Sequence, residues 1–224
     1  MSGYWKRLTD PDGTGSMIAP TVAVIGRLEA GEAPAAVAST LFLDSADLVA
    51  LIALEAFGEN VTDGPALVQA APRRPGLASA LSEPALAGLF PGATRPARLA
   101  LSAGLLQVHD FWDLSHQAAQ QAGDLGESRY SAWWHGIAHR REPDAGNASY
   151  WFRRVGPHPL FPELAEAARP IVETEPHLAA LLPGGTWDPF AFIDLCTRVR
   201  RNVWLAQILQ RLEMRLLLGA SIPE

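Results

Sequence analysis

The segment from Leu99 to Gln121 places the strongest constraint on the fold, because apolar residues surround almost the whole helix that it would form. A helix that is apolar nearly all round is buried in a protein interior. Each helical residue advances by about 100°, so positions i, i+4 and i+7 share one face. Three titratable residues of this segment follow that spacing, namely His109, Asp113 and His116.

The next predicted helix carries a second row with the same spacing, formed by His135, His139 and Glu142. Pro143 disfavours helical geometry at Glu142, so the last member of this row lies at the end of the helix. Buried polar groups are costly without partners. If the two helices pack antiparallel, the two rows face each other across the core.

Four imidazoles with one or two carboxylates are typical of a metal site between the helices of a bundle. Imidazole ligation suits zinc, iron, manganese or nickel and argues against calcium or magnesium. The residue after His135 is Gly136, so this is not the zinc-protease helix motif, which has a glutamate there. We predict a divalent transition metal ion bound by His109, Asp113, His116, His135 and His139.

Two other interpretations of the histidines remain open at this point. They can line a metal-free catalytic or ligand-binding pocket. They can also be core residues whose ring nitrogens bond to carbonyl or carboxylate groups, for example His109 with Asp113 in one helix. The histidine pattern predicts a cluster, and the chemistry of the cluster is a separate question.

The residues that follow the second row are candidates for substrate binding and proton transfer. The arginines can hold a carboxylate or phosphate through paired hydrogen bonds, and they are Arg140, Arg141, Arg153 and Arg154. The candidate proton carriers are Glu142, Asp144 and His158. In the alternative interpretation, the arginines pair with nearby carboxylates and tie a long loop to the helices.

These candidates predict a metal-dependent enzyme that acts on a small polar or anionic substrate. Its reaction class, whether hydrolase, lyase or oxygen-using, is undetermined. The alternative is a non-enzymatic interaction or regulatory protein with a structural histidine core. The sequence has no Gly-x-Ser-x-Gly elbow, no Gly-x-Gly-x-x-Gly and no phosphate-binding Gly-Lys-Ser/Thr loop. Serine hydrolysis and nucleotide-dependent chemistry are therefore disfavoured.

The chain is expected to be all-α, with a bundle-like main domain and a small N-terminal helical module. The module spans 1–58, with a helix that begins after Asp44 and runs through Ala56. A proline- and glycine-rich linker with short helical turns spans 59–97. The main domain spans 98–224, and its predicted helices are 98–122, 128–141, 162–181 and 189–218. The missing alternation of strands and helices argues against a doubly wound fold.

The composition of the chain limits the kinds of binding partner that we expect. The formal net charge is −6, which makes nucleic acid an unlikely partner because phosphate binding normally needs a basic surface.

The single cysteine, Cys196, excludes an internal disulfide. Residues 1–17 lack the apolar stretch of a signal peptide, and charged residues interrupt the apolar run 203–218, so a cytoplasmic protein is expected by default. The apolar residues of the C-terminal helix are candidates either for a homodimer contact or for the internal core.

Two stretches resemble known proteins. The run from Pro20 to Ala38, followed by Leu43-Asp-Ser-Ala-Asp-Leu, resembles the small antitoxin-associated helical domains of bacteria, which are three-helix, winged or helix-turn-helix-like modules. This segment has few basic residues, so we expect packing or dimerisation rather than DNA binding. The patterns His-Asp-Phe-Trp, Trp-His-Gly-Ile-Ala-His-Arg-Arg-Glu-Pro-Asp and Asn-Ala-Ser-Tyr-Trp-Phe-Arg-Arg-Val-Gly-Pro-His-Pro resemble a set of uncharacterised bacterial and fungal proteins. That second resemblance implies no activity.

Overall fold

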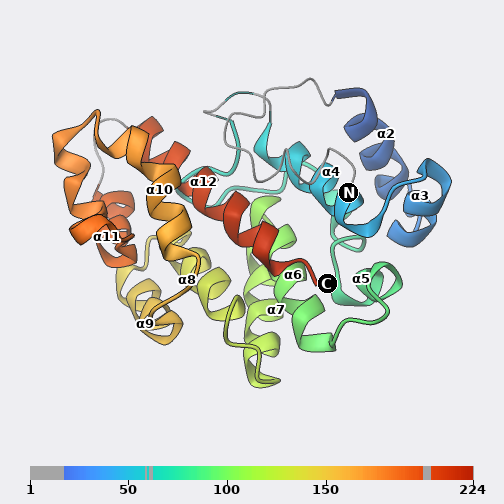
Figure 1. Ribbon diagram of the computed structural model, residues 1–224. Coiled ribbons are helices and arrows are strands. Elements are labelled where there is room, and N and C mark those ends of the chain that lie inside the picture. The colour runs from blue at the N-terminus through green and yellow to red at the C-terminus, as the bar shows by residue number, and fades with distance from the viewer. Residues whose placement is uncertain (1–17, 59, 61–62, 199–202, 224) are drawn as a thin grey trace.

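The computed structural model describes residues 18–58, 60, 63–198 and 203–223. Residues 1–17, which the sequence analysis considered for a signal peptide, lie outside the described residues. Every regular element in the described part of the chain is a helix, so the predicted all-α class is confirmed (Figure 1).

Three helices form the N-terminal part: α2 (Ile18–Glu29), α3 (Pro34–Leu41) and α4 (Ser45–Phe57). The predicted N-cap of α4 is confirmed, because the Asp44 side chain accepts a hydrogen bond of 2.8 Å from the backbone N–H of Asp47. Gly58 follows α4 with a φ of 67°, a conformation that glycine adopts easily.

Phe42 connects α3 to α4 in a left-handed conformation, with a φ of 54°, and its side chain is 97% exposed. A residue with a Cβ is strained in this region of backbone space. We expect Phe42→Gly to raise the free energy of unfolding by about 1 kcal/mol, measured by urea denaturation. Phe42→Ala retains the Cβ and is the matched control, expected to give little gain. A Phe42→Gly protein less stable than Phe42→Ala would contradict the strain argument.

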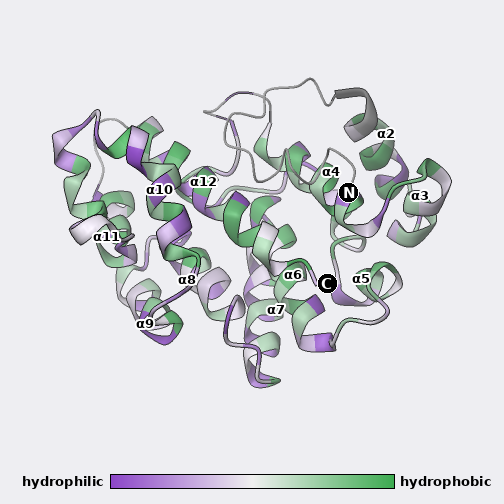
Figure 2. Ribbon diagram, in the orientation of Figure 1, coloured by the Kyte–Doolittle hydropathy of each residue, from purple (hydrophilic) through white to green (hydrophobic). Residues whose placement is uncertain are grey.

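The predicted linker contains a 3-10 turn, η1 (Pro75–Leu77), and a short helix, α5 (Glu83–Leu89), in agreement with its predicted helical turns. The predicted division into 1–58, 59–97 and 98–224 stays a prediction. Buried apolar side chains from both sides of the linker, such as Leu51 on α4 and Leu101 of the following helix, belong to one core cluster. α4 itself is mainly hydrophobic (Figure 2).

The single helix predicted over 98–122 is wrong, because the chain turns between α6 (Arg95–Val108) and α7 (Trp112–Asp124). Asp110 has a φ of 66°, and the Phe111 N–H donates to the carbonyl of Leu106 at 2.9 Å. This is the Schellman ending of a helix, which glycine or asparagine normally provides. Because Asp110 stands where glycine or asparagine is usual, the sequence did not indicate that α6 ends there.

The next two helices are α8 (Ser131–Arg141) and α9 (Ala145–Val155). α8 is buried along its whole length and packs against α7 and α9. α9 was not predicted, and its N-cap is Asp144, whose side chain accepts from the Asn147 N–H at 2.9 Å. Gly136 lets α9 come close, since a Cβ there would lie only 2.7 Å from the Phe152 ring.

The C-terminal part contains α10 (Phe161–Val172), the 3-10 turns η2 (Pro176–Leu181) and η3 (Pro183–Gly185), α11 (Pro189–Arg198) and α12 (Val203–Ser221). The segment predicted as helical over 162–181, which Pro170 and Pro176 are expected to split or kink, is divided into two elements: α10 ends at Val172 and η2 begins at Pro176. The predicted helix 189–218 is described as two elements, with 199–202 between them outside the described residues.

α12 connects parts of the molecule that are distant in sequence, and Figure 1 shows it running from α10 toward α6. Arg211 on this helix donates hydrogen bonds to the backbone carbonyls of Phe57, Gly58 and Asn60 at the end of α4. Gln210 donates to the carbonyls of Pro65 and Ala66, both at 3.0 Å. α12 thereby binds the segment that follows α4 through side-chain hydrogen bonds.

Within the described residues, no single helix combines the length and the apolar character needed to cross a bilayer. α3 and α4 together reach that length and composition, but they are bent by 107° from each other.

Candidate metal centre

Three of the five predicted ligands come together between α7 and α8. One ligand atom from each of His116, His135 and His139 lies within 4.8 Å of the others. The rings of His135 and His139 stack with centroids 5.1 Å apart, as their four-residue spacing on α8 predicts. The His116 ring meets them edge-on, at 4.2 and 5.1 Å. His135 and His139 are buried and His116 is partly exposed.

His109 and Asp113 lie outside this group. The turn at Asp110 separates His109 from α7, so His109 and His116 do not share a helix face. The His109 Nε2–H donates to the carbonyl of Ile52 at 3.0 Å. Asp113 is exposed on the first turn of α7, although its carboxylate is close enough to favour the protonated form of His116. The described ligand group is thus three imidazoles.

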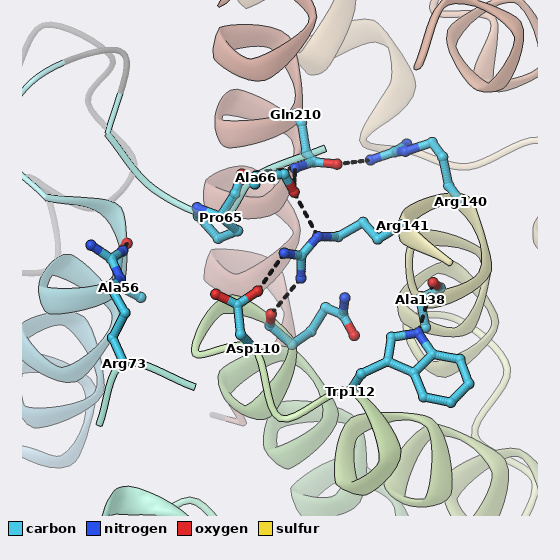
Figure 3. A network of polar contacts seen from close by, with 11 residues as sticks. Ala56, Pro65, Ala66, Arg73, Asp110, Trp112, Ala138, Arg140, Arg141 and Gln210 are labelled. Carbon is cyan, nitrogen blue, oxygen red and sulfur yellow. Dashed lines mark hydrogen bonds and ion pairs between the residues drawn. The ribbon is translucent and has the colours of Figure 1, made fainter. Parts of the chain in front are cut away.

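Two tryptophans that the sequence analysis missed lie against the histidine rings. Trp112 stacks on His116 at 5.1 Å between centroids, and its Nε1–H donates to the Ala138 carbonyl at 2.9 Å (Figure 3). Trp151 stacks on His135 at 3.7 Å. The spacing of Trp112 and His116 on one helix was a usable signal. The Trp151 contact depends on how α9 packs and had no signal in the sequence.

His139 has two polar neighbours. Its Nδ1–H donates to the Glu142 carboxylate at 2.8 Å, so Glu142 does join its predicted row at the end of α8. This bond leaves Nε2 with the free lone pair. The amide nitrogen of Asn147 lies 3.1 Å from that Nε2 and 3.3 Å from Nδ1. Asp144, predicted as a proton carrier, instead caps α9 and so helps to place Asn147.

Burial favours the neutral form of two histidines of the cluster, His135 and His116. It lowers the pKa of His135 to about 3, with smaller contributions from the charges of His116 and His139. Burial also lowers the pKa of His116, and His139 adds to this effect while Glu142 and Asp113 oppose it. The Nδ1 of His135 is buried and has no hydrogen-bond partner among the described residues. A neutral imidazole with an unshared lone pair is the form that binds metal.

The two adjacent arginines at the end of α8, Arg140 and Arg141, form buried ion pairs. Arg140 forms an ion pair with Glu213 at 2.5 Å, and its guanidinium lies 4.4 Å from the centroid of the Phe192 ring. Arg141 pairs with Asp110 at 2.5 Å and donates to the carbonyl of Ala66 (Figure 3). The two side chains therefore bond to segments from outside α8, and neither partner is one of the nearby carboxylates suggested by the sequence.

The second doublet, Arg153 and Arg154, is exposed on α9. The Arg154 guanidinium lies 5.4 Å from the centroid of the Trp151 ring, and Trp151 in turn stacks on His135. Of the four predicted substrate-binding arginines, Arg154 is thus the one described in contact with a wall of the histidine cluster.

His158, the remaining predicted proton carrier, is buried away from the cluster. Its Nε2–H donates to the Arg129 carbonyl at 3.0 Å, and its Nδ1 accepts from the Leu160 N–H at 3.2 Å. Its ring packs edge-on against Trp133 at 4.9 Å. Burial lowers its pKa. With both nitrogens occupied, His158 is placed to hold the loop before α10.

Comparisons with protein-family models, with characterised proteins and with solved structures each give no match to this chain.

Proposed function

We propose that the protein is a metal-dependent enzyme that holds one divalent transition metal ion between His116, His135 and His139. The observation that carries this proposal is the convergence of three imidazoles from two helices within 4.8 Å. The buried, unpartnered Nδ1 of His135 supports it, since such a group is costly unless something binds it. An all-imidazole donor set favours zinc, iron, manganese or nickel.

The spacing fits a metal after a small adjustment. Nitrogens that bind one tetrahedral zinc ion lie about 3.3 Å apart, given Zn–N bonds of about 2.0–2.1 Å. The group spans up to 4.8 Å, so the rings would have to draw together slightly. The Glu142–His139 hydrogen bond is the carboxylate–histidine arrangement that orients metal ligands. A metal at Nε2 of His139 would displace the amide of Asn147 from that nitrogen.

The donor set favours activation of water over other metal chemistry. Three protein ligands leave a coordination position open, as in catalytic rather than structural zinc sites. Non-haem iron oxygenases normally include a carboxylate ligand, and the described group has none. A bound metal would act as a Lewis acid toward water and a substrate oxygen. We therefore favour a reaction of metal-activated water, hydrolysis or lyase-type hydration, over the oxygen-using class predicted from the sequence.

The chain's own residues provide the remaining roles. Glu142 orients His139, and Trp112 and Trp151 shield two sides of the cluster from water. Asp113, exposed near His116, is the carboxylate available to accept a proton from water. Arg154, beside Trp151, is available to hold negative charge on a small polar or anionic substrate.

Metal content tests the proposal directly. We expect about one transition metal ion per chain in untagged protein analysed by plasma mass spectrometry, and almost none in the His135→Ala/His139→Ala variant. His177→Ala is the control, because His177 is half exposed and lies outside the cluster. Wild-type protein that contains no metal and binds no added zinc, manganese, iron or nickel would contradict the proposal and favour a structural histidine core.

Glu142→Gln tests the orienting role of this carboxylate. Glutamine has nearly the same shape but no charge, so the basicity of His139 should fall. We expect metal affinity to fall by about 10- to 100-fold, measured by competition with a chelator. Glu166→Gln, at an exposed position on α10, is the matched control. Equal affinities of the Glu142→Gln protein and the wild type would remove Glu142 from the site.

A further inference from the structure

A cavity lies where the end of α4 meets the turn between α6 and α7, and its lining does not include the histidine cluster. Its volume is about 210 Å³, and its lining includes Glu55, Ala56, Arg73, Arg74, His109 and Asp110. Typical pockets for drug-sized ligands measure about 300–1,000 Å³. The cavity therefore suits a small molecule rather than a nucleotide or a peptide.

Two buried residues line the inner part of this cavity. His109 is 6% exposed and Asp110 is 8% exposed. Because the Nε2–H of His109 donates to the Ile52 carbonyl, Nδ1 is the hydrogen-bond acceptor of this ring. Burial, reinforced by the charges of Arg73 and Arg74, lowers the pKa of His109 to about 4, so the ring stays neutral. The lining of the cavity thus includes a residue whose Nδ1 is a hydrogen-bond acceptor with no described partner of its own.

The charged groups that line the cavity differ in their partners. Arg74 pairs with Glu55 at 2.9 Å and with Glu29 at 3.4 Å, and Asp110 pairs with Arg141 at 2.5 Å. Arg73 is exposed, and the hydrogen bond described for it goes to the backbone carbonyl of Ala56, at 3.0 Å. Figure 3 shows Arg73 beside Ala56. No carboxylate in the described part of the chain forms an ion pair with Arg73.

We propose that this cavity binds a small molecule in which a carboxylate is joined to a hydrogen-bond-donating hydroxyl or ammonium group, as in α-hydroxy acids and α-amino acids. The carboxylate accepts hydrogen bonds from the free N–H groups of Arg73. The hydroxyl or ammonium group donates to Nδ1 of His109. This inference is independent of metal binding, since the cavity contains none of the three cluster histidines.

Isothermal titration of the full-length protein at neutral pH tests the site, with glycolate, glycine, acetate and inorganic phosphate as probes. We expect saturable binding of glycolate or glycine, and their comparison shows whether the donor is a hydroxyl or an ammonium group. Arg73→Gln should weaken that binding by about tenfold or more. Arg169→Gln, at a partly exposed position on α10 outside the cavity, should leave it unchanged.

Nitrogen NMR of the histidine rings locates the bound molecule. Glycolate or glycine should shift the Nδ1 signal of His109 and leave the signals of His177 unchanged, because His177 is outside the cavity. Absence of saturable binding by both probes would overturn the proposal, and so would undiminished binding by Arg73→Gln. Acetate or phosphate binding as tightly as glycolate and glycine would overturn the proposed ligand class, because neither probe has the same donor group beside a carboxylate.

Discussion

Replacing Glu213 by alanine is expected to lower the free energy of unfolding by about 3–5 kcal/mol, because it leaves a buried charge without its partner. The side chains of Glu213 and Arg140 are both 0% exposed. Glu213 accepts from two guanidinium nitrogens of Arg140, at 2.5 and 3.1 Å, and from the Trp133 Nε1–H at 2.9 Å. One substitution therefore removes three hydrogen bonds in the interior.

The guanidinium of Arg140 cannot escape by losing its proton at any ordinary pH. After loss of Glu213, its remaining described side-chain acceptor is Gln210, at 3.4 Å. The positive charge would stay buried with one long hydrogen bond. This uncompensated charge, rather than the lost attraction, accounts for most of the expected destabilisation.

Urea denaturation followed by circular dichroism measures the effect. The double variant Arg140→Met/Glu213→Leu removes both charges and should be less destabilised than Glu213→Ala alone. Glu166→Ala, with a side chain that is 76% exposed, should change stability little. If Glu213→Ala and Glu166→Ala proved equally stable, the pair would not be buried as described.

The second large effect concerns His109 and pH. Burial lowers its pKa to about 4 in the folded protein, against 6.5 for the free side chain. Below 6.5 the unfolded chain takes up a proton that the folded protein does not, so stability falls as pH falls from 6.5 toward 4. The full shift corresponds to a loss of about 3 kcal/mol. Above 6.5 this histidine contributes no pH dependence.

Comparison with His109→Gln isolates this contribution from that of the other histidines. Glutamine has an N–H that can donate to the Ile52 carbonyl but does not titrate in this range. We expect the wild-type stability to fall by about 3 kcal/mol more than that of the variant between neutral pH and pH 4, measured by urea denaturation at several pH values. Parallel stability curves for the two proteins would show that His109 is solvated in the folded state.

The helix ends that the sequence predicted well are those determined by residues at the end itself. Asp44 caps α4 through its own side chain, and Pro143 ends α8 through its own ring. The break between α6 and α7 had no such signal, since Asp110 is held in its unusual conformation by Arg141, which is 31 residues away. α9 is short, and its sequence read as a loop, whereas in the structure it packs tightly on Gly136 of α8.

The site was partly predictable for the same reason. His135 and His139 share one helix, so their spacing fixed their relation, and His116 joins them because α7 packs on α8. The sequence analysis missed the break between α6 and α7, and it therefore wrongly placed His109 on the same helix face as His116. Sequence could not show that Arg140 faces Glu213, which is 73 residues away. Nor could it show that Trp151 covers His135, since that contact depends on the path of an unpredicted helix.

The hydrogen bonds from α12 to the end of α4 also bear on how the chain reaches its native state. Arg211 and Gln210 bond to carbonyls that lie roughly 145 to 154 residues earlier. Contacts between such distant residues form slowly, because a long loop must close before any stabilisation is gained. During synthesis, the carbonyls of Phe57 and Pro65 would lack these donors until α12 has emerged from the ribosome. The N-terminal helices should therefore acquire their final order late, and that interval is when the nascent chain would depend most on chaperones.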